Sequence, residues 1–352
     1  MVSTTATDFW NDSCAPLELQ NALLQGAVGA TSNPVIVTHV LKSEFSSWER
    51  RLKEIISQNP EYSEIEVGWK IYEEITAHGA HFLLPAFEKY HGLKGRLSIQ
   101  VDPALYNNPA AMLVQAERFS QLAPNLQIKF PVTPAGLAAI EEATYRGIPI
   151  TGTVCFTVAQ SIAVAEAVER GLNRRQAEGK PLGPAVPVCA FMVGRTDDWM
   201  RVLSQRDQID IPKEYLDWAG VACLKKSYAI YQQRGYRTRL LVAAYRTVLH
   251  WSEFIGGDLA MTITSEWQDK INASGVEVRP RMQDPVKPEI LDALLARIPD
   301  FRRAYGETEL PVNDFTHYGA TTRTLRAFIQ SSHDLTALVR DVMLPNVDLK
   351  AN

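Results

Sequence analysis

Short apolar segments alternate with longer amphipathic segments along most of the chain. Each of seven short apolar segments is followed by a stretch whose hydrophobic residues recur at helical spacing. The seven segments are residues 27–31, 95–102, 126–131, 148–154, 187–193, 239–245 and 259–264. Together with a short strand near residues 7–10, they predict eight strand–helix units.

Alternation of strands and helices predicts a parallel sheet in which the helices are the crossover connections. Eight such units in a chain of 352 residues favour a closed barrel over an open sheet. An open doubly wound sheet is the alternative, but it usually carries a glycine-rich phosphate turn, and no GxGxxG follows any predicted strand. The predicted fold class is therefore α/β, a (β/α)8 TIM barrel.

Two segments are longer than such a barrel requires. Residues 44–92 should form two or more helices between the second and third strands. Residues 286–345 are mostly helical in pattern and should wrap the barrel. We therefore expect one domain over residues 1–352, in which residues 286–352 form a helical C-terminal region that packs on the barrel.

Charge and hydropathy exclude several function classes. The net charge is −4 and no basic run occurs, which argues against a nucleic-acid partner. No stretch reaches the roughly 18 consecutive apolar residues of a membrane helix. The first residues lack the charged-then-apolar order of a signal peptide. We therefore expect a cytoplasmic protein that binds neither nucleic acid nor membrane.

The cysteines and histidines show no metal-binding pattern. Cys14, Cys155, Cys189 and Cys223 lack metal-ligand spacing and are typical of reduced thiols in a cytoplasmic protein. The seven histidines form no HxxxH or HxH pair. We predict no metal site.

One lysine lies inside a predicted strand, in the segment LQIKFPVT (126–133). Catalytic groups of a barrel gather at the C-terminal ends of its strands. Burial there would lower the pKa of Lys129, and a neutral amine can form a Schiff base with a ketone or aldehyde. In the alternative interpretations, the lysine stem extends to water or its amine pairs with an acid at the rim.

Other polar residues fall at the same ends of the predicted strands. An acid there could move protons, an asparagine could hold a sugar hydroxyl, and two arginines after the sixth and seventh strands could bind a phosphate. Each has a plainer alternative: a turn or helix cap for the acid and the asparagine, and an ion pair with Asp197 or Asp198 for Arg195. The candidates are Asp12, Asn33, Gln100, Thr151, Thr153, Arg195 and Arg246.

Six ordered segments resemble the motifs of the transaldolase family, over about residues 7 to 265. They are GATSNPVI, LSIQVDP, IKFPVTPAGLAAI, GIPITGTVCFTVAQ, FMVGRTDDW and AAYRT. The resemblance implies a class I, Schiff-base aldol enzyme of carbohydrate metabolism, in the pentose phosphate pathway, that acts on sugar phosphates. It also implies that no cofactor is needed, because the lysine supplies the electron sink, and that the protein forms a homodimer.

The resemblance implies a role for each catalytic candidate. Lys129 would form the iminium with a ketose carbonyl. Asp12 would take the proton of the C4 hydroxyl as the C3–C4 bond breaks. Thr153 would position the water that relays protons during the carbinolamine steps.

The resemblance implies binding roles as well. Asn33 would hold the three-carbon dihydroxyacetone unit. Arg195 and Arg246 would bind the phosphate of the ketose and of the acceptor aldehyde.

Several positions depart from the family pattern. Gln100 stands where transaldolases usually have a glutamate; an amide can orient water but cannot act as a base. Glutamine there is typical of the fructose-6-phosphate aldolase-like branch. Thr151 replaces an asparagine, Ala190 and Ala244 replace serines, and Met192 replaces an aromatic residue. These changes predict an altered substrate pocket.

The sequence leaves three functions open. The first is a transferase that moves a dihydroxyacetone unit from a phosphorylated or otherwise anionic ketose to an aldehyde acceptor. The second is a lyase with the same Schiff-base chemistry that needs no acceptor. The third is a non-catalytic barrel that binds a sugar phosphate.

Overall fold

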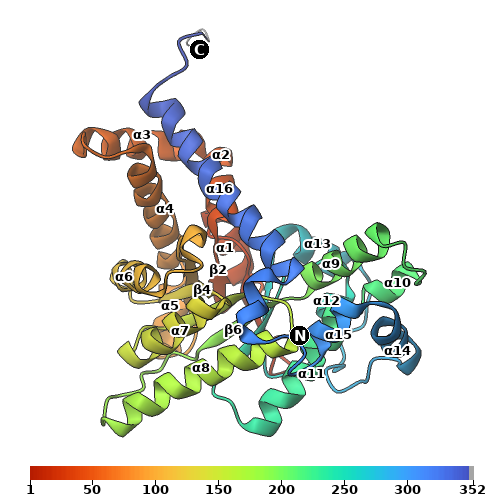
Figure 1. Cartoon of the computed structure of the whole chain (residues 1–352). Helices are drawn as coiled ribbons and strands as arrows, with labels where there is room; N and C mark the ends of the chain where they lie inside the picture. The colour runs from red at the N-terminus through yellow and green to blue at the C-terminus, as the bar shows by residue number, and fades with distance from the viewer. Residues whose placement is uncertain (349–352) are drawn as a thin grey trace.

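A computed structural model describes residues 1–348 and shows eight parallel strands that close into a barrel in sequential order (Figure 1). The predicted α/β barrel fold is therefore confirmed, and every strand overlaps its predicted segment. The strands are β1 (Asp8–Asn11), β2 (Gly29–Thr31), β3 (Arg96–Gln100), β4 (Leu126–Pro131), β5 (Ile150–Cys155), β6 (Val188–Met192), β7 (Arg239–Ala243) and β8 (Ala260–Ile263).

Burial on both faces explains why the strands read as short apolar segments. Every residue of β3, β4 and β5 is buried. Side chains of alternate residues point into the barrel, and those between them pack under the surrounding helices. Gln100 pairs with Lys129, and Lys129 pairs with Thr151, so these three residues lie at one level of the sheet.

Side-chain caps set the starts of several crossover helices. The side chains of four residues each accept a backbone hydrogen bond at the start of a helix, and these are Asn33, Asn108, Thr133 and Thr157. The crossover helices are α1 (Pro16–Leu24), α2 (Pro34–Ser43), α6 (Pro109–Ser120), α7 (Pro134–Arg146), α8 (Val158–Ala177), α9 (Val193–Arg206), α10 (Lys213–Leu216), α11 (Ala219–Arg234), α12 (Leu249–Ser252) and α13 (Ser265–Ala273).

The extra helices lie where the sequence predicted them. Between β2 and β3 the chain adds α3 (Phe45–Gln58), α4 (Glu64–His81) and α5 (Leu84–Lys89); a short helix η1 (Pro103–Leu105) follows β3. After β8 come α14 (Pro288–Arg297), α15 (Pro299–Tyr305), η2 (Val312–His317) and α16 (Gly319–Met343). No helix within residues 1–348 is both long and apolar enough to span a bilayer.

Helix α16 runs alongside the helices inserted after β2 (Figure 1). The Oγ1 of Thr38 in α2 donates to the carbonyl of Ser331, 3.2 Å away, and Arg340 forms an ion pair with Glu64 at the start of α4. The C-terminal helix thus ties the inserted helices to the barrel. Residues 349–352 of the expected C-terminal region lie outside the described residues, and the single-domain assignment stays a prediction.

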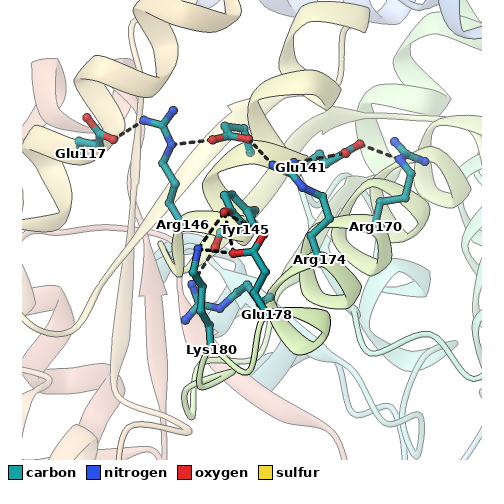
Figure 2. Close-up of polar contacts among 10 residues, drawn as sticks. Glu117, Glu141, Tyr145, Arg146, Arg170, Arg174, Glu178 and Lys180 are labelled. Atoms are coloured by element: carbon teal, nitrogen blue, oxygen red, sulfur yellow. Dashed lines mark hydrogen bonds and ion pairs between the residues drawn. The ribbon is translucent and has the colours of Figure 1, made fainter.

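An ion-pair network links the outer faces of α6, α7 and α8 (Figure 2). Arg146 pairs with Glu117 of α6, and Arg174 of α8 reaches Glu141 of α7 at 3.6 Å and lies over the ring of Tyr145. These side chains are partly or largely exposed, so each pair contributes only about 0–1 kcal/mol. The buried helix faces hold this side of the barrel together.

The turn between β4 and α7 allows no side chain at Gly136. A Cβ atom there would lie 1.7 Å from the carbonyl oxygen of Pro131, because the first turn of α7 sits directly on the end of β4. Gly136→Ala should therefore lower the free energy of unfolding by about 1–3 kcal/mol or more, measured by urea unfolding.

Gly68 in α4 is the matched control, because its nearest neighbours would be 3.8 Å from a new Cβ atom. Gly68→Ala should raise the free energy of unfolding by about 0.5–1 kcal/mol, since alanine loses less backbone entropy in a helix. Equal urea midpoints for Gly136→Ala and the unmodified protein would contradict this account of the turn.

Candidate active site

A cavity of about 280 Å³ opens at the C-terminal ends of the strands. Its walls come from most of the strands, from the loops that follow them and from α16. Six of the eight residues proposed from the sequence line it, and Gln100 and Thr151 do not. The six are Asp12, Asn33, Lys129, Thr153, Arg195 and Arg246.

The amine of Lys129 is enclosed by the barrel. The residue is 5% exposed, and its Nζ donates to the carbonyl oxygen of Ser32 at 3.0 Å. Burial lowers the pKa of Lys129 to about 8, while the charge of Asp12 acts in the opposite direction. The hydrogen-bond partner is a neutral carbonyl, so the geometry differs from that of a rim lysine paired to an acid.

The carboxyl of Asp12 lies directly after β1. The Oγ1 of Thr31 donates to its Oδ1 at 2.6 Å and lies 2.5 Å from the Oγ1 of Thr262. Burial raises the pKa of Asp12, and the charges of Lys129 and Arg195 and the Thr31 hydrogen bond oppose that rise. A raised pKa makes the protonated form more accessible, so this carboxyl is suited to donating a proton as well as accepting one.

Gln100 and Thr151 lie at the level of Lys129 but do not reach the cavity. The Thr151 hydroxyl is 3.1 Å from that of Ser98 across the barrel interior. Gln100 is 1% exposed, and neither atom of its amide has a hydrogen-bond partner within the described residues. The structure thus gives neither Thr151 nor Gln100 a surface on the cavity, and the amide of Gln100 is a buried donor and acceptor without a partner within the described residues.

Asn33 combines its two predicted roles in one position. Its Oδ1 accepts from the backbone nitrogen of Ile36 at 3.1 Å, so it caps α2, and the residue also lines the cavity. Thr153 lines the cavity from β5, where it pairs with Pro131 at the end of β4. The helix-cap interpretation of Asn33 therefore does not exclude contact with a ligand.

A chain of hydrogen bonds holds Arg246 at the cavity. Its Nη2 pairs with Asp198 at 2.9 Å and its Nη1 donates to the carbonyl of Tyr245 at 2.8 Å. Its backbone nitrogen donates to Nδ1 of His250 at 3.0 Å. Nε2 of His250 lies 2.7 Å from Oδ2 of the buried Asp197, to which it donates because Nδ1 is the acceptor. The backbone of Arg246 is therefore anchored to the interior.

Arg195 is the less compensated of the two guanidinium groups. It forms no ion pair within the described residues, because Asp198 pairs with Arg246 instead. Its Nη1 donates to Thr324 of α16 at 3.4 Å, its Cζ lies 5.5 Å from the ring centre of Phe328, and its Nε is buried without a partner. Burial, together with the charge of Arg246, lowers the pKa of Arg195. The alternative of a pair with a neighbouring acid is not seen.

Sequence reasoning missed several residues of this site, among them Thr31, Tyr245, Thr324 and Phe328. Thr324 and Phe328 were missed because no pattern in α16 shows which of its residues reach the barrel mouth. Thr31 and Tyr245 each lie within two residues of a candidate at the end of a strand. Their position in the sequence could therefore have identified them. Tyr245 lines the cavity, and its hydroxyl is buried without a hydrogen-bond partner within residues 1–348.

The arrangement can perform a specific chemistry. A buried amine can condense with a carbonyl, a nearby carboxyl can move a proton, and two guanidinium groups can hold an anion. Within residues 1–348, no cluster of three or more histidine, cysteine or acidic side chains could hold a metal ion.

Comparisons with known proteins point to one family. The family model described as “Transaldolase/Fructose-6-phosphate aldolase” matches residues 9–337. “Transaldolase” of Mycobacterium leprae (strain Br4923) is 28% identical over 254 residues, 69% of this chain and 67% of that protein. “Transaldolase 2” of Nostoc sp. is 32% identical over 195 residues, 51% of this chain and 47% of that protein. “Transaldolase” of Thiobacillus denitrificans is 30% identical over 208 residues, 56% of each chain. The aligned segments thus span about half to two thirds of these relatives.

If Arg195 binds an anion at this mouth, its loss should weaken binding that is detected at Lys129. Phosphate should protect Lys129 from an anionic acylating reagent, and peptide mass spectrometry reports that modification at the residue itself. Charge-assisted hydrogen bonds contribute about 1.5–3 kcal/mol each, so Arg195→Met should raise the half-protecting phosphate concentration about ten- to a hundredfold.

Arg206 is the control, because it lies at the far end of the same helix and pairs with Asp207. Arg206→Met should leave the half-protecting concentration unchanged. Equal protection in the two variants would show that Arg195 does not hold the anion.

Proposed function

Because the chain belongs to the transaldolase/fructose-6-phosphate aldolase family, we propose that it transfers a dihydroxyacetone unit from a phosphorylated or otherwise anionic ketose to an aldehyde acceptor. One observation carries the proposal: the amine of Lys129 is buried in the barrel mouth, its pKa is lowered to about 8, and the Asp12 carboxyl shares its cavity. The names of the aligned relatives support transfer, and the substrates remain part of the proposal.

The first half-reaction cleaves the donor. The neutral amine of Lys129 attacks the ketose carbonyl, and loss of water from the carbinolamine leaves a protonated Schiff base. Asp12 accepts the proton of the C4 hydroxyl, the electrons of the C3–C4 bond move into the iminium, and an aldehyde departs. The products are an enamine on Lys129 and a protonated Asp12.

The second half-reaction reverses these events with a new aldehyde. The enamine carbon attacks the acceptor carbonyl, and Asp12 returns its proton to the oxygen that becomes the new hydroxyl. Water then hydrolyses the Schiff base, which releases the product ketose and restores the amine. Thr153 would position the water that relays protons in the carbinolamine steps.

The binding residues divide the cavity into two ends. Arg195 and Arg246 would hold the phosphate, and the uncompensated charge of Arg195 supports that role. Asn33 would hold the dihydroxyacetone unit near Lys129. Tyr245, which sequence reasoning did not include, brings a free hydroxyl donor to the same cavity.

A lyase is the second candidate, and Gln100 favours it. The Gln100 amide, at the level of Lys129 in the sheet, can orient water toward the enamine, whereas it cannot act as the base that a glutamate would be. Ala190, Met192 and Ala244 line the cavity without a hydroxyl, so they give an acceptor sugar fewer polar contacts. Protonation of the enamine by water would then release dihydroxyacetone without any acceptor.

A barrel that only binds sugar phosphate is less supported, because both Lys129 and Asp12 are present in one cavity.

Borohydride trapping tests the covalent step. Reduction in the presence of a ketose should leave a stable adduct on Lys129, located by peptide mass spectrometry. Lys225 is an internal control, because its amine is partly buried but bonds to Glu253 at 2.9 Å. Lys129→Ala should abolish both adduct and turnover while the far-ultraviolet circular dichroism is unchanged.

A control variant, Lys53→Ala, removes an exposed amine that pairs with Glu49 in α3, and it should keep full activity. Turnover by Lys129→Ala, or an adduct on Lys225 in place of Lys129, would refute the assignment.

Gln100→Glu tests the choice between transferase and lyase. The added carboxyl resembles the residue usual in transaldolases, so we expect the ratio of transfer to cleavage to rise. Product formation is measured with and without an aldehyde acceptor. Gln121→Glu, on the exposed end of α6, should leave the ratio unchanged. The same ratio in both variants would mean that Gln100 does not govern the fate of the enamine.

A further inference from the structure

A second cavity, of about 440 Å³, opens at the opposite end of the barrel, where the strands begin. Asp8, Arg96 and Arg239, the first residues of β1, β3 and β7, line it. The catalytic groups lie at the other ends of the strands, so the two cavities are separated by the interior of the barrel. We refer to this space as the basal cavity.

Arg96 is a buried cation without a counter-ion. The residue is 5% exposed, and its Nε donates to the carbonyl of Gly92 at 3.0 Å. Its Nη1 is buried without a partner, and no acid pairs with the guanidinium within residues 1–348. Its Cζ lies 5.0 Å from the ring centre of Phe87. Burying a charge without a partner costs folding free energy, so an arginine kept in this state needs a reason.

The acids of the basal cavity are already engaged. Asp8 pairs with Lys94 at 2.7 Å and also with Arg239. Asp258 pairs with Arg239 at 2.9 Å. Both carboxylates are therefore held by other cations, and Arg96 leaves the cavity with an uncompensated positive charge.

Two neutral groups of the cavity wall are also without partners. The Nε2 of Gln127 donates to the carbonyls of Ile150 at 2.6 Å and Val186 at 3.2 Å, which fixes the orientation of the amide. Its Oε1 is therefore an acceptor, and it has no partner within the described residues. The Oγ1 of Thr238 has none either. The cavity thus presents a cation together with an acceptor that needs a hydroxyl donor.

We propose that the basal cavity is a binding site for a small hydroxylated anion, such as a polyol phosphate or a hydroxy acid, whose charged group lies on Arg96. The hydroxyl groups would donate to Gln127 and exchange hydrogen bonds with Thr238. Trp10 and Tyr231 add ring surface to the wall. A cavity of this size suits a ligand of a few carbons.

The alternative is that Arg96 only closes the floor of the barrel. Residues at the N-terminal face of such barrels usually serve stability. A residue with that role would have its charge compensated and its nitrogens bonded, and its loss would destabilise the fold. The two interpretations therefore predict opposite effects of Arg96→Met on the melting temperature.

A binding experiment on the full chain isolates the basal cavity. The mouth is first disabled by Arg195→Met with Arg246→Met, and binding is then followed by isothermal titration calorimetry. The probes are glycerol phosphate, glycerate and inorganic phosphate, with glycerol as the neutral comparison. We expect one glycerol phosphate or glycerate per chain, weaker binding of inorganic phosphate, and none of glycerol. If glycerol phosphate binds more strongly than glycerate, the site prefers a phosphate. If glycerate binds more strongly, the site prefers a carboxylate.

Arg96→Met in this background should weaken binding at least tenfold. Arg234→Met is the control, because it removes one positive charge from the end of α11 near the cavity, where Arg234 pairs with Glu166 and Glu307. That control should bind as before. Equal binding with and without Arg96, or no binding of any anionic probe in the background protein, would overturn the proposal.

Thermal unfolding supplies an independent readout. Glycerol phosphate should raise the melting temperature of the mouth-disabled protein, because a ligand that binds only the folded state stabilises it. Arg96→Met should melt at the same or a higher temperature without ligand and show no ligand-dependent rise. A lower melting temperature with an undiminished rise would show that Arg96 is only structural. None of these outcomes depends on Schiff-base chemistry at Lys129.

Discussion

The amine of Lys129 is buried in the mouth of the barrel, and the Asp12 carboxyl attracts it without a direct ion pair. Desolvation favours the neutral amine, whereas the carboxylate favours the ammonium. Desolvation is the larger effect and sets the pKa of Lys129 at about 8. The unfolded chain keeps this proton to a higher pH than the folded protein does. Below about pH 8 the amine is charged in both states, so burial of the charge lowers the free energy of unfolding by its full amount. That cost is relieved as the pH rises toward the ordinary lysine value. The barrel thus gives up stability near neutral pH to hold a nucleophile.

Closure of the barrel brings the partners of this amine together. Asp12, Lys129, Arg195 and Arg246 come from four different strand–helix units, and only a closed ring of parallel strands places them around one mouth. Helix α16 completes the wall beside Arg195, where Phe328 lines the cavity and Thr324 accepts a hydrogen bond from the guanidinium. The inserted helices after β2 matter to the site because α16 packs along them. The basal cavity depends on the same strands at their other ends, so one sheet presents two separate sets of polar groups.

Hydropathy alternation was sufficient to predict the fold, because parallel strands buried on both faces leave short apolar segments between amphipathic helices. The strand-end rule also placed six of eight candidates at one cavity. It failed for Gln100 and Thr151: both pair with Lys129 in the sheet, but neither lines the cavity, and a period of two cannot show which side chains reach it. It also failed for tertiary contacts, since the docking of α16 and the pairing of Asp198 with Arg246 involve segments far apart in sequence. The expected homodimer, the cytoplasmic location and the single domain stay predictions.

The pKa of Lys129 in the folded protein tests the central claim most directly. Lysine residues labelled at the carbon next to the amine can be titrated by NMR, with Lys129→Met identifying the signal. The account predicts a titration near pH 8 for Lys129, clearly separated from the exposed lysines near pH 10.4. A Lys129 signal that titrates together with the exposed lysines would show that burial does not lower the pKa of this amine and would contradict the account.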